Sequence, residues 1–295
     1  MQLLADVALL ALWLASGRNA AMALEIRYVM AAAAMLLAWV GVYNATRVPS
    51  LKDVRIDIAG LPPQFDGYTL VQLTDLHISR LFPAGWTRAV VDRTKALDVD
   101  LIVITGDVID GSLAMRRADV EPLRDLRARD GVFMSPGNHE YFLGYQEWMR
   151  HFAEMGMHIL ANDQVVLRRQ GGNLILVGVT DRTAPATGMP PPDLAAALAG
   201  APAGAPILLL DHQPGPAHTA AACGVSLQLS GHTHGGMIPG LDRLVAMGNK
   251  GFVSGRYMVD GMTLYVNNGT GIWPGFAMRL GRPAELTRIT LHRKS

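Results

Sequence analysis

The sequence predicts an α/β domain with two facing β-sheets covered by helices, preceded by an apolar N-terminal segment. Three observations lead to this prediction. After residue 48, the first half of the chain alternates short apolar runs with helical patterns, whereas the second half consists mostly of apolar runs of strand length. Residues 1–48 differ in composition from everything that follows. The 295 residues, half of them hydrophobic, suffice for one large domain with a buried core and an additional segment.

The N-terminal segment is predicted to be a membrane anchor. The run Tyr28–Tyr43 has sixteen residues, none of them charged, and is bounded by Arg27 and Arg47. A spanning helix needs roughly 20 residues, but this helix can extend back toward Met22 if the Arg27 side chain snorkels. The aromatic residues at its ends suit membrane interfaces. A buried core helix is the alternative, and a cleaved signal peptide fits less well because no Lys or Arg precedes the first apolar run.

That first apolar run, Val7–Ala15, is followed by a turn-like stretch, Ser16–Asn19, so a helical hairpin is the alternative to a single helix. Basic residues lie on both sides of the main helix, and the positive-inside rule therefore does not decide its orientation. We expect an anchor over residues 1–48 and a soluble domain over residues 49–295. The expected location is the cell membrane, with the extracytoplasmic side favoured.

The elements of the soluble domain follow from apolar periodicity and turn residues. In its first half we predict strands at 68–74, 100–105 and 131–135, and helices at 86–97, 114–128 and 145–155. In its second half we predict strands near 165–167, 174–179, 207–210, 225–229, 263–266 and 286–291. The stretch 184–205 is rich in Pro, Ala and Gly and is predicted to be a loop around a short helix at 193–198.

Charge and cysteine content exclude several classes of function. The formal net charge is +1 and no long basic run occurs, so we expect no nucleic-acid partner. Cys223 is the single cysteine, which excludes an internal disulfide and a thiolate metal site.

Five of the nine histidines lie just past the end of a predicted strand, beside Asp, Asn or Gly. The stretches that carry them or their acidic neighbours read "TDLHIS", "TGDVIDG", "PGNHEY", "LLDHQP" and "SGHTHGG". In open α/β sheets, ligands bind beyond the carboxyl ends of strands. We therefore expect these stretches to meet at one site, with the candidate metal ligands Asp75, His77, Asp107, Asn138, His212, His232 and His234.

The residue types point to two divalent metal ions and a phosphoester substrate. Asp75 and His77 are two residues apart, so on an extended strand end their side chains share a face, and Asp107 follows a tight turn where its carboxylate can bridge two ions. Nitrogen and oxygen ligands together suit Mn, Fe, Zn or a similar ion. Two divalent ions outweigh the two aspartates, so the site attracts an anion. His139 is then placed to act as a general acid.

Two acidic residues near these motifs receive other interpretations. We expect Asp110 to cap the turn that follows it rather than to reach the site, and Glu140 to orient the "NHE" loop. The four remaining histidines lack acidic or glycine neighbours in the sequence and are expected on the surface or on helices.

The order of the motifs, D-x-H, G-D, G-N-H-E, H and G-H-x-H, resembles the calcineurin-like metallophosphoesterases over residues 54–292. The wording of "TDLHIS", "LLDHQP", "SGHTHGG" and "NNGTGIWPGFAMRLGRPAE" is most similar to the membrane-associated bacterial phosphodiesterase branch (YaeI-like). The resemblance implies a four-layer α/β/β/α sandwich with a binuclear metal site. By motif, one ion is held by Asp75, His77, Asp107 and His234, the other by Asp107, Asn138, His212 and His232, with His139 as the acid.

The chain also departs from its relatives, many of which begin with a twin-arginine export signal. Here only the single arginines Arg18 and Arg27 precede the apolar helix. The segment 269–279 is also worded differently, so we expect an altered lip of the site.

Two apolar stretches, Leu81–Trp86 and Ile272–Met278, flank the motifs and form either an apolar rim beside the metals or packed loop interior. The first alternative predicts a lipid-bearing phosphoester that meets the site at the bilayer surface. Related enzymes cleave the pyrophosphate of UDP-diacylglucosamine, which makes that compound a candidate. The expected activity is thus that of a phosphodiesterase or pyrophosphatase. A phosphomonoesterase or protein phosphatase is the alternative, and a scaffold without activity is disfavoured because every ligand position is filled.

Overall fold

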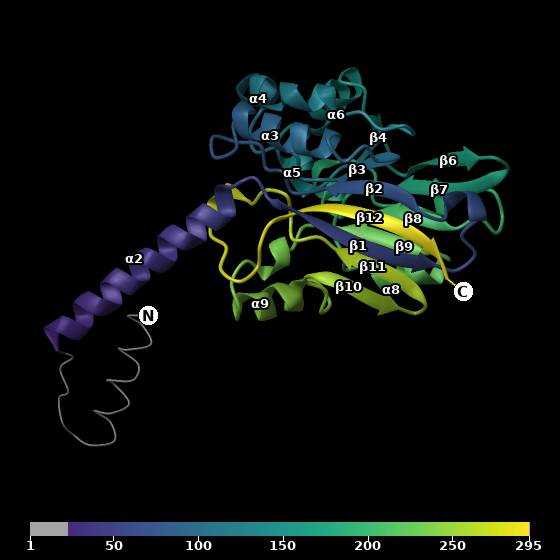
Figure 1. Ribbon diagram of the computed structural model, residues 1–295. Coiled ribbons are helices and arrows are strands. Elements are labelled where there is room, and N and C mark those ends of the chain that lie inside the picture. The colour runs from purple at the N-terminus through teal and green to yellow at the C-terminus, as the bar shows by residue number, and fades with distance from the viewer. Residues whose placement is uncertain (1–22, 295) are drawn as a thin grey trace.

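Two six-stranded mixed sheets pack face to face in the computed structural model, which describes residues 23–294, and helices cover the outer face of each sheet (Figure 1). The four-layer α/β/β/α sandwich is confirmed. The helices are α2 (Leu24–Thr46), α3 (Ala84–Lys95), α4 (Leu113–Val120), α5 (Asn138–Phe142), α6 (Tyr145–Glu154), α7 (Leu194–Ala197), α8 (Ala217–Ala222) and α9 (Leu241–Gly248).

The first sheet has the order β1-β12-β2-β3-β4-β5. Its strands are β1 (Ser50–Ile58), β2 (Tyr68–Leu73), β3 (Leu101–Thr105), β4 (Val132–Ser135), β5 (His158–Ile159) and β12 (Glu285–Arg293). β3 and β4 are buried at every position and read as unbroken apolar runs, as expected of parallel strands covered on both faces. Helices α3, α4 and α6 cover the outer face, where Val90, Trp148 and Phe152 are buried against Ile102 and Ile104.

The second sheet has the order β10-β11-β9-β8-β7-β6. Its strands are β6 (Asp163–Arg169), β7 (Gly172–Gly178), β8 (Ile207–Leu210), β9 (Leu227–Ser230), β10 (Gly255–Val259) and β11 (Met262–Val266). The apolar side chains between the two sheets form one cluster that includes Leu70, Leu101, Leu176, Leu208 and Leu229. Because β2, β3 and β4 are parallel neighbours, as are β8, β9 and β11, each sheet ends its central strands at a single edge. The loops that follow these strands therefore converge.

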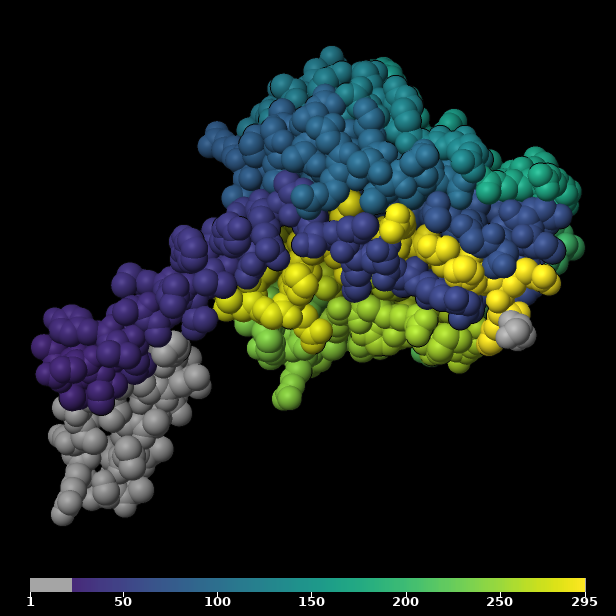
Figure 2. All heavy atoms as spheres, viewed as in Figure 1, coloured from purple at the N-terminus to yellow at the C-terminus, as the bar shows by residue number. Residues whose placement is uncertain are grey.

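Helix α2 projects from the body of the domain (Figures 1 and 2). Its 23 residues are mostly apolar and mostly exposed, and the helix has the length and composition of a membrane span. Gly41 and Ala45 are its buried residues. Residues 7–19, where a hairpin was an alternative to a single helix, lie outside the described part of the chain.

Most predicted elements are present with shifted ends. The helix expected over 114–128 ends at Val120 and continues as a 3₁₀ helix, Glu121–Asp125, because Pro122 has no N–H to donate within an α-helix. Strands β1, β5 and β10 and helices α5, α8 and α9 were not among the predicted elements. β1 is an edge strand with charged residues at alternate positions, a pattern that protects an open edge and conceals the strand in an apolar profile.

Candidate metal centre

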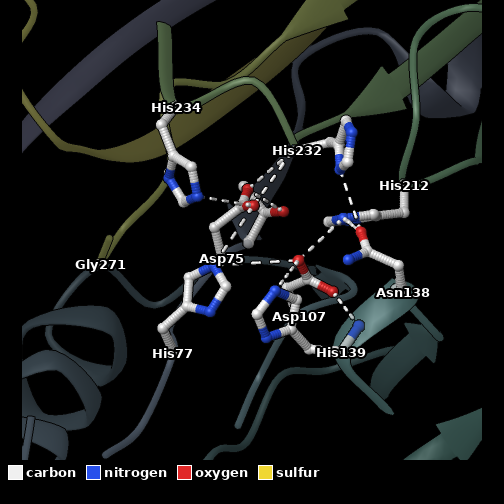
Figure 3. A network of polar contacts seen from close by, with 12 residues as sticks. Asp75, His77, Asp107, Asn138, His139, His212, His232, His234 and Gly271 are labelled. Atoms are coloured by element: carbon white, nitrogen blue, oxygen red, sulfur yellow. Dashed lines mark hydrogen bonds and ion pairs between the residues drawn. The ribbon is translucent and has the colours of Figure 1, made fainter. Parts of the chain in front are cut away.

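The loops after five strands bring all seven candidate ligands together with His139 (Figure 3). Asp75 and His77 follow β2, Asp107 follows β3, and Asn138 and His139 begin α5 directly after β4. His212 follows β8, and His232 and His234 follow β9. The strand-end placement expected from the sequence is therefore what the structure has. The metal coordination itself stays a prediction.

One group of ligand atoms lies around Asp75. The Nε2 atoms of His77 and His234 lie 3.9 and 3.8 Å from Asp75 Oδ1. His77 Nε2 also lies 3.8 Å from Asp107 Oδ2. These three buried residues, Asp75, His77 and His234, can each offer one atom to a shared ion.

The other group lies around Asn138. His212 Nε2 lies 3.1 Å from Asn138 Oδ1 and also 3.1 Å from Asp107 Oδ2, and His232 Nδ1 lies 3.0 Å from Asn138 Oδ1. Atoms that bind one ion at about 2.0–2.2 Å are separated by roughly 3.0–3.5 Å, as these are. Asp107 Oδ2 lies next to both groups, near His77 Nε2 and His212 Nε2. Burial raises the pKa of Asp107, but His212 and His77 hold it well below its usual value, so this side chain is a carboxylate.

The hydrogen bonds of the histidines leave their inner nitrogens free for metal ions. His77 Nδ1 donates to Asp110 Oδ2 at 2.8 Å, and His212 Nδ1 donates to the Thr105 carbonyl at 2.7 Å. Such second bonds fix the tautomer in which Nε2 presents its lone pair. His77 Nε2 is buried without any hydrogen-bond partner. An orphaned nitrogen that faces two carboxylates fits divalent ions, and the mixed N and O donors match Mn, Fe or Zn.

The backbone of the site is held in an unusual conformation. Five candidate ligands have positive φ, with values of 50° at Asp75, 45° at His77, 53° at Asp107, 69° at His232 and 49° at His234. Each such residue costs on the order of 1–3 kcal/mol, and a cluster of them is typical of functional sites. These residues lie in the loops that follow the strands, where the candidate ligands meet.

The glycines of "SGHTHGG" allow this loop to come close to its neighbours. A Cβ at Gly231 would lie 2.2 Å from Asp75 Oδ2, and the next N–H, that of His232, donates to both carboxylate oxygens of Asp75 at 3.1 Å. Gly235 has a φ of +65°. The two histidine side chains consequently face different groups, His232 toward Asn138 and His234 toward Asp75 (Figure 3).

Asp110 reaches the site, so the expectation that it only caps a turn is wrong. Its Oδ1 accepts a hydrogen bond from His139 Nδ1 at 2.6 Å, while its Oδ2 accepts the bond from His77. One carboxylate thus orients a metal-ligand candidate and the candidate acid. The sequence contains one indication of this role, an acidic residue only three positions after the candidate ligand Asp107. The loop after β3 places this residue next to His77 and His139.

His139 carries its second ring nitrogen toward the centre, with Nε2 3.9 Å from Asp107 Oδ2. Burial lowers the pKa of His139, but Asp110, Asp107 and Glu140 outweigh burial and raise the pKa to about 9. Cations bound to Asp107 would bring that pKa down again. A protonated imidazole held in this way has a proton available at Nε2, as a general acid requires.

Glu140 does not face the ligands but holds their loops, as expected. Its buried carboxylate accepts hydrogen bonds from the backbone N–H groups of Asp107, Val108 and Gly137, at 3.0, 2.7 and 2.7 Å. The loops after β3 and β4 are thereby tied together.

Arg279 was missed by sequence reasoning. Its guanidinium is fully buried and donates to the carbonyl oxygens of His234, Asn268 and Gly271, at 2.9, 2.6 and 2.8 Å. Burial lowers its pKa to about 10. This side chain supports the His234 loop. It lies in the stretch "NNGTGIWPGFAMRLGRPAE", which carried the family resemblance, but the sequence did not indicate this role.

The two apolar stretches beside the motifs, Leu81–Trp86 and Ile272–Met278, differ in how far their side chains are exposed. In the first, Phe82 is fully buried and its ring lies 4.4 Å from that of Trp86, tilted by 46°, so this side chain packs in the interior. In the second, Ile272 is buried, whereas Trp273 and Phe276 remain 47% and 37% exposed. Trp273 lines a cavity of about 310 Å³ together with Asp107, His139 and His234.

Comparison with known proteins establishes the family. The family described as calcineurin-like phosphoesterase matches residues 68–236, more than half of the chain. A zebrafish (Danio rerio) protein named "Transmembrane protein with metallophosphoesterase domain" is 34% identical over an alignment of 268 positions that covers 87% of this chain and 60% of that protein. The Bacillus subtilis protein "Uncharacterized metallophosphoesterase YkuE" is 30% identical over an alignment of 237 positions that covers 78% of this chain and 81% of that protein.

The chain therefore belongs to the calcineurin-like phosphoesterases, a family of hydrolases that use divalent metal ions, and the family prediction is confirmed. The assignment to a YaeI-like branch within the family stays a prediction. The chain spans about 60% of the zebrafish relative and 66% of a Helicobacter pylori relative, "Uncharacterized metallophosphoesterase", with which it shares 31% identity.

Proposed function

We propose that the chain is a two-metal phosphodiesterase or pyrophosphatase that acts at the membrane on a lipid-linked or nucleotide-lipid phosphoester. The observation that carries the hydrolase activity is the convergence of strained, buried ligand residues around Asp107, in a chain whose family consists of phosphoesterases. In this proposal residues 1–48 anchor the protein and residues 49–295 form the catalytic domain.

The proposed ligands of one ion are Asp75, His77, Asp107 and His234, and those of the other are Asp107, Asn138, His212 and His232. When bound, two divalent ions polarise the phosphoryl group and lower the pKa of a water molecule. Hydrogen bonds within the protein position these ligands. Asp110 accepts from His77, the Thr105 carbonyl accepts from His212, and Glu140 accepts from the backbone N–H of Asp107. His139 holds a proton at Nε2 for the leaving oxygen, while Asp110 fixes the ring through Nδ1.

The lipid character of the substrate is supported by the surroundings of the site. Trp273 is an exposed apolar side chain that lines the cavity with the ligands, and the exposed Phe276 follows it by three residues. Helix α2 is an exposed, mostly apolar helix attached to the same domain. The zebrafish relative carries "transmembrane protein" in its name, which supports membrane anchoring through α2. A phosphomonoesterase or protein phosphatase is the alternative activity.

The test of the reaction uses the full chain in phospholipid nanodiscs with Mn²⁺, assayed on aryl phosphodiesters, aryl phosphomonoesters and lipid pyrophosphates. We expect hydrolysis of diesters and pyrophosphates above that of monoesters, and loss of all activity after chelation that Mn²⁺ restores. Activity that survives complete removal of metal ions contradicts the two-metal proposal. Faster turnover of monoesters establishes the alternative.

The test of the lipid preference compares the double variant Trp273→Ser, Phe276→Ser with the unaltered chain. We expect turnover of a lipid phosphoester to fall more steeply than turnover of a water-soluble diester, because the variant removes apolar contact and leaves the ligands in place. Equal losses on both substrates would rule out an apolar rim that selects lipid.

A further inference from the structure

The end of α2 is fixed to the catalytic domain without a flexible linker. The backbone N–H of Arg279 donates to the carbonyl oxygen of Gly41 at 3.0 Å. Gly41 also lets Met278 approach, since a Cβ there would lie 2.6 Å from Met278 Cγ. Ala45 is buried in a small cluster with Phe82. Because α2 ends at Thr46 and β1 begins at Ser50, a bilayer that holds α2 also sets the orientation of the domain.

The level of the bilayer surface can be read from the aromatic residues of α2. Trp39 and Tyr43 stack with ring centroids 5.9 Å apart, both exposed, and the Arg47 guanidinium lies 6.0 Å from the Tyr43 ring. Exposed aromatic residues followed by a basic residue are typical of the interface between hydrocarbon and water. Gly41, where the domain is attached, lies between these two aromatic residues. The neighbouring face of the domain must therefore lie at the level of the lipid headgroups.

Helix α9 lies on that face. In Figure 1 it is on the side of the domain from which α2 extends, and in Figure 2 the yellow C-terminal segment lies between the two. None of its residues is buried, and Leu244 and Met247 are 64% and 81% exposed. These two are three positions apart and share one side of the helix. Arg243 and Lys250 are exposed nearby. A short helix with uncovered apolar side chains and basic neighbours has the pattern of an interfacial helix.

The same helix borders the metal centre. Leu244 and Val245 line the cavity of about 310 Å³ that also contains Asp107 and His139, and Trp273 lines it as well. A surface or molecule that contacts α9 would therefore also lie at the opening of the metal centre.

We propose that α9, together with Trp273 and Phe276, docks on the bilayer surface and holds the opening of the metal centre against it, so that substrate enters from the lipid. This inference rests on the proposed membrane anchor. A protein partner is disfavoured, because eight helical residues and two aromatic side chains are far fewer than the roughly 20–30 residues per side of a standard protein–protein interface. The bilayer is the partner that α2 itself brings to this level.

The experiment measures the immersion of a nitroxide label at position 247 in the full chain. Cys223→Ser gives a background without cysteine, and Met247→Cys carries the label. Met258→Cys is the matched control, because Met258 is likewise an exposed methionine, on β10, paired with Thr263 at the end of β11 farther from the metal centre. In nanodiscs that hold one chain each, we expect the label at 247 to lose most of its accessibility to a water-soluble nickel complex and to gain accessibility to oxygen. The label at 258 should remain accessible to nickel.

Two outcomes overturn the proposal. One is equal nickel accessibility at positions 247 and 258. The other is shielding at 247 in crowded proteoliposomes that disappears in single-chain nanodiscs, which would identify a second copy of the chain as the partner. Hydrolysis of a water-soluble aryl diester by the same samples tests the proposed activity separately. A shielded label in a protein without activity leaves the docking in place and contradicts the proposed function alone.

Discussion

Two clusters of buried charged side chains lie at opposite ends of the first sheet. At the end where β2, β3 and β4 begin, Asp100 accepts hydrogen bonds from the Thr69 N–H at 2.9 Å and from Arg169 at 2.7 Å. Asp130 accepts a hydrogen bond from the Tyr68 hydroxyl at 2.7 Å, and the Arg169 guanidinium lies 4.8 Å from the Tyr68 ring. Each carboxylate there has a donor within the protein.

At the end where these strands finish, Asp75 and Asp107 accept hydrogen bonds from the backbone N–H groups of His232 and His139, but not every ligand atom has a hydrogen-bond partner. His77 Nε2 has no partner, and it lies 3.8 to 3.9 Å from the nearest carboxylate oxygens of Asp75 and Asp107. Backbone strain accompanies this cluster. The two clusters differ in how their polar atoms are paired. In the first, every carboxylate has a hydrogen-bond donor within the protein, as a structural cluster requires. In the second, a buried ligand atom lacks a partner, which fits a site that binds cations.

The sharpest test of this comparison is Asp107→Asn. Asp107 contributes an oxygen to both groups of ligands, so its loss should lower phosphodiester hydrolysis at least about 10³-fold, the equivalent of several kcal/mol of transition-state stabilisation. Titration of the metal-free variant with Mn²⁺ should show weaker binding than in the wild type, because the oxygen next to both groups of ligands loses its charge. Activity assays and the Mn²⁺ titration measure the two effects. Unchanged activity and unchanged Mn²⁺ binding would mean that Asp107 does not hold the ions.

His139→Gln should have the next largest effect and should leave metal content unchanged. A general acid contributes about 10²–10⁴-fold, and we expect the low end for a nitrophenyl ester, whose leaving group needs little protonation. The loss should grow for an alkyl ester of the same phosphate. An equal loss on both esters, measured as kcat with saturating Mn²⁺, would remove His139 from the role of the acid.

Asp110→Asn tests a residue that acts through two others. Its amide cannot accept a charge-assisted bond from both His77 Nδ1 and His139 Nδ1, so we expect Mn²⁺ affinity to fall roughly 10- to 100-fold. Titration of the metal-free protein with Mn²⁺ gives the affinity, and kcat at saturating Mn²⁺ gives the separate effect on His139. Unchanged values of both would show that the two hydrogen bonds position nothing.

The strand-end motifs were predictable because they are local. A buried strand followed by Asp, Asn, Gly or His appears as a few consecutive letters, and parallel topology brings such letters together at one edge of the sheet. A contact between two segments that lie far apart in the chain has no such local pattern in the sequence. Arg279 reaches the carbonyl of His234 across 45 positions, and its partners are backbone atoms that leave no trace in the sequence.

Helix α9 shows a second limit. It was not recognised because its apolar pattern covers only eight residues, too few to stand out as a helix in the sequence, and none of them is buried in the domain. The proposed docking on the bilayer accounts for its exposed leucine and methionine. The predicted lipid-facing rim included Trp273 and did not include Leu244, which lines the same cavity, and the rim itself stays a prediction.

The smallest expected effect belongs to the complete cluster. Asp100→Asn should lower the free energy of unfolding by roughly 1–2 kcal/mol at pH 7, because Arg169 loses a charged acceptor while an amide oxygen can still accept the Thr69 N–H. Activity should be unchanged.

Burial raises the pKa of Asp100, but the hydrogen bonds from Thr69 and Arg169 outweigh it and lower the pKa below its usual value. A lowered pKa contributes stability above the unfolded value of about 4, and that contribution is lost as the pH falls through the folded value. The difference in the free energy of unfolding between wild type and variant, measured in urea, should consequently become smaller below about pH 4. Asp57→Asn is the control, because it removes an exposed ion pair with Arg55. It should change the free energy of unfolding by less than about 0.5 kcal/mol at any pH. If Asp100→Asn were as harmless as Asp57→Asn, the cluster at this end would not be the structural counterpart of the metal centre.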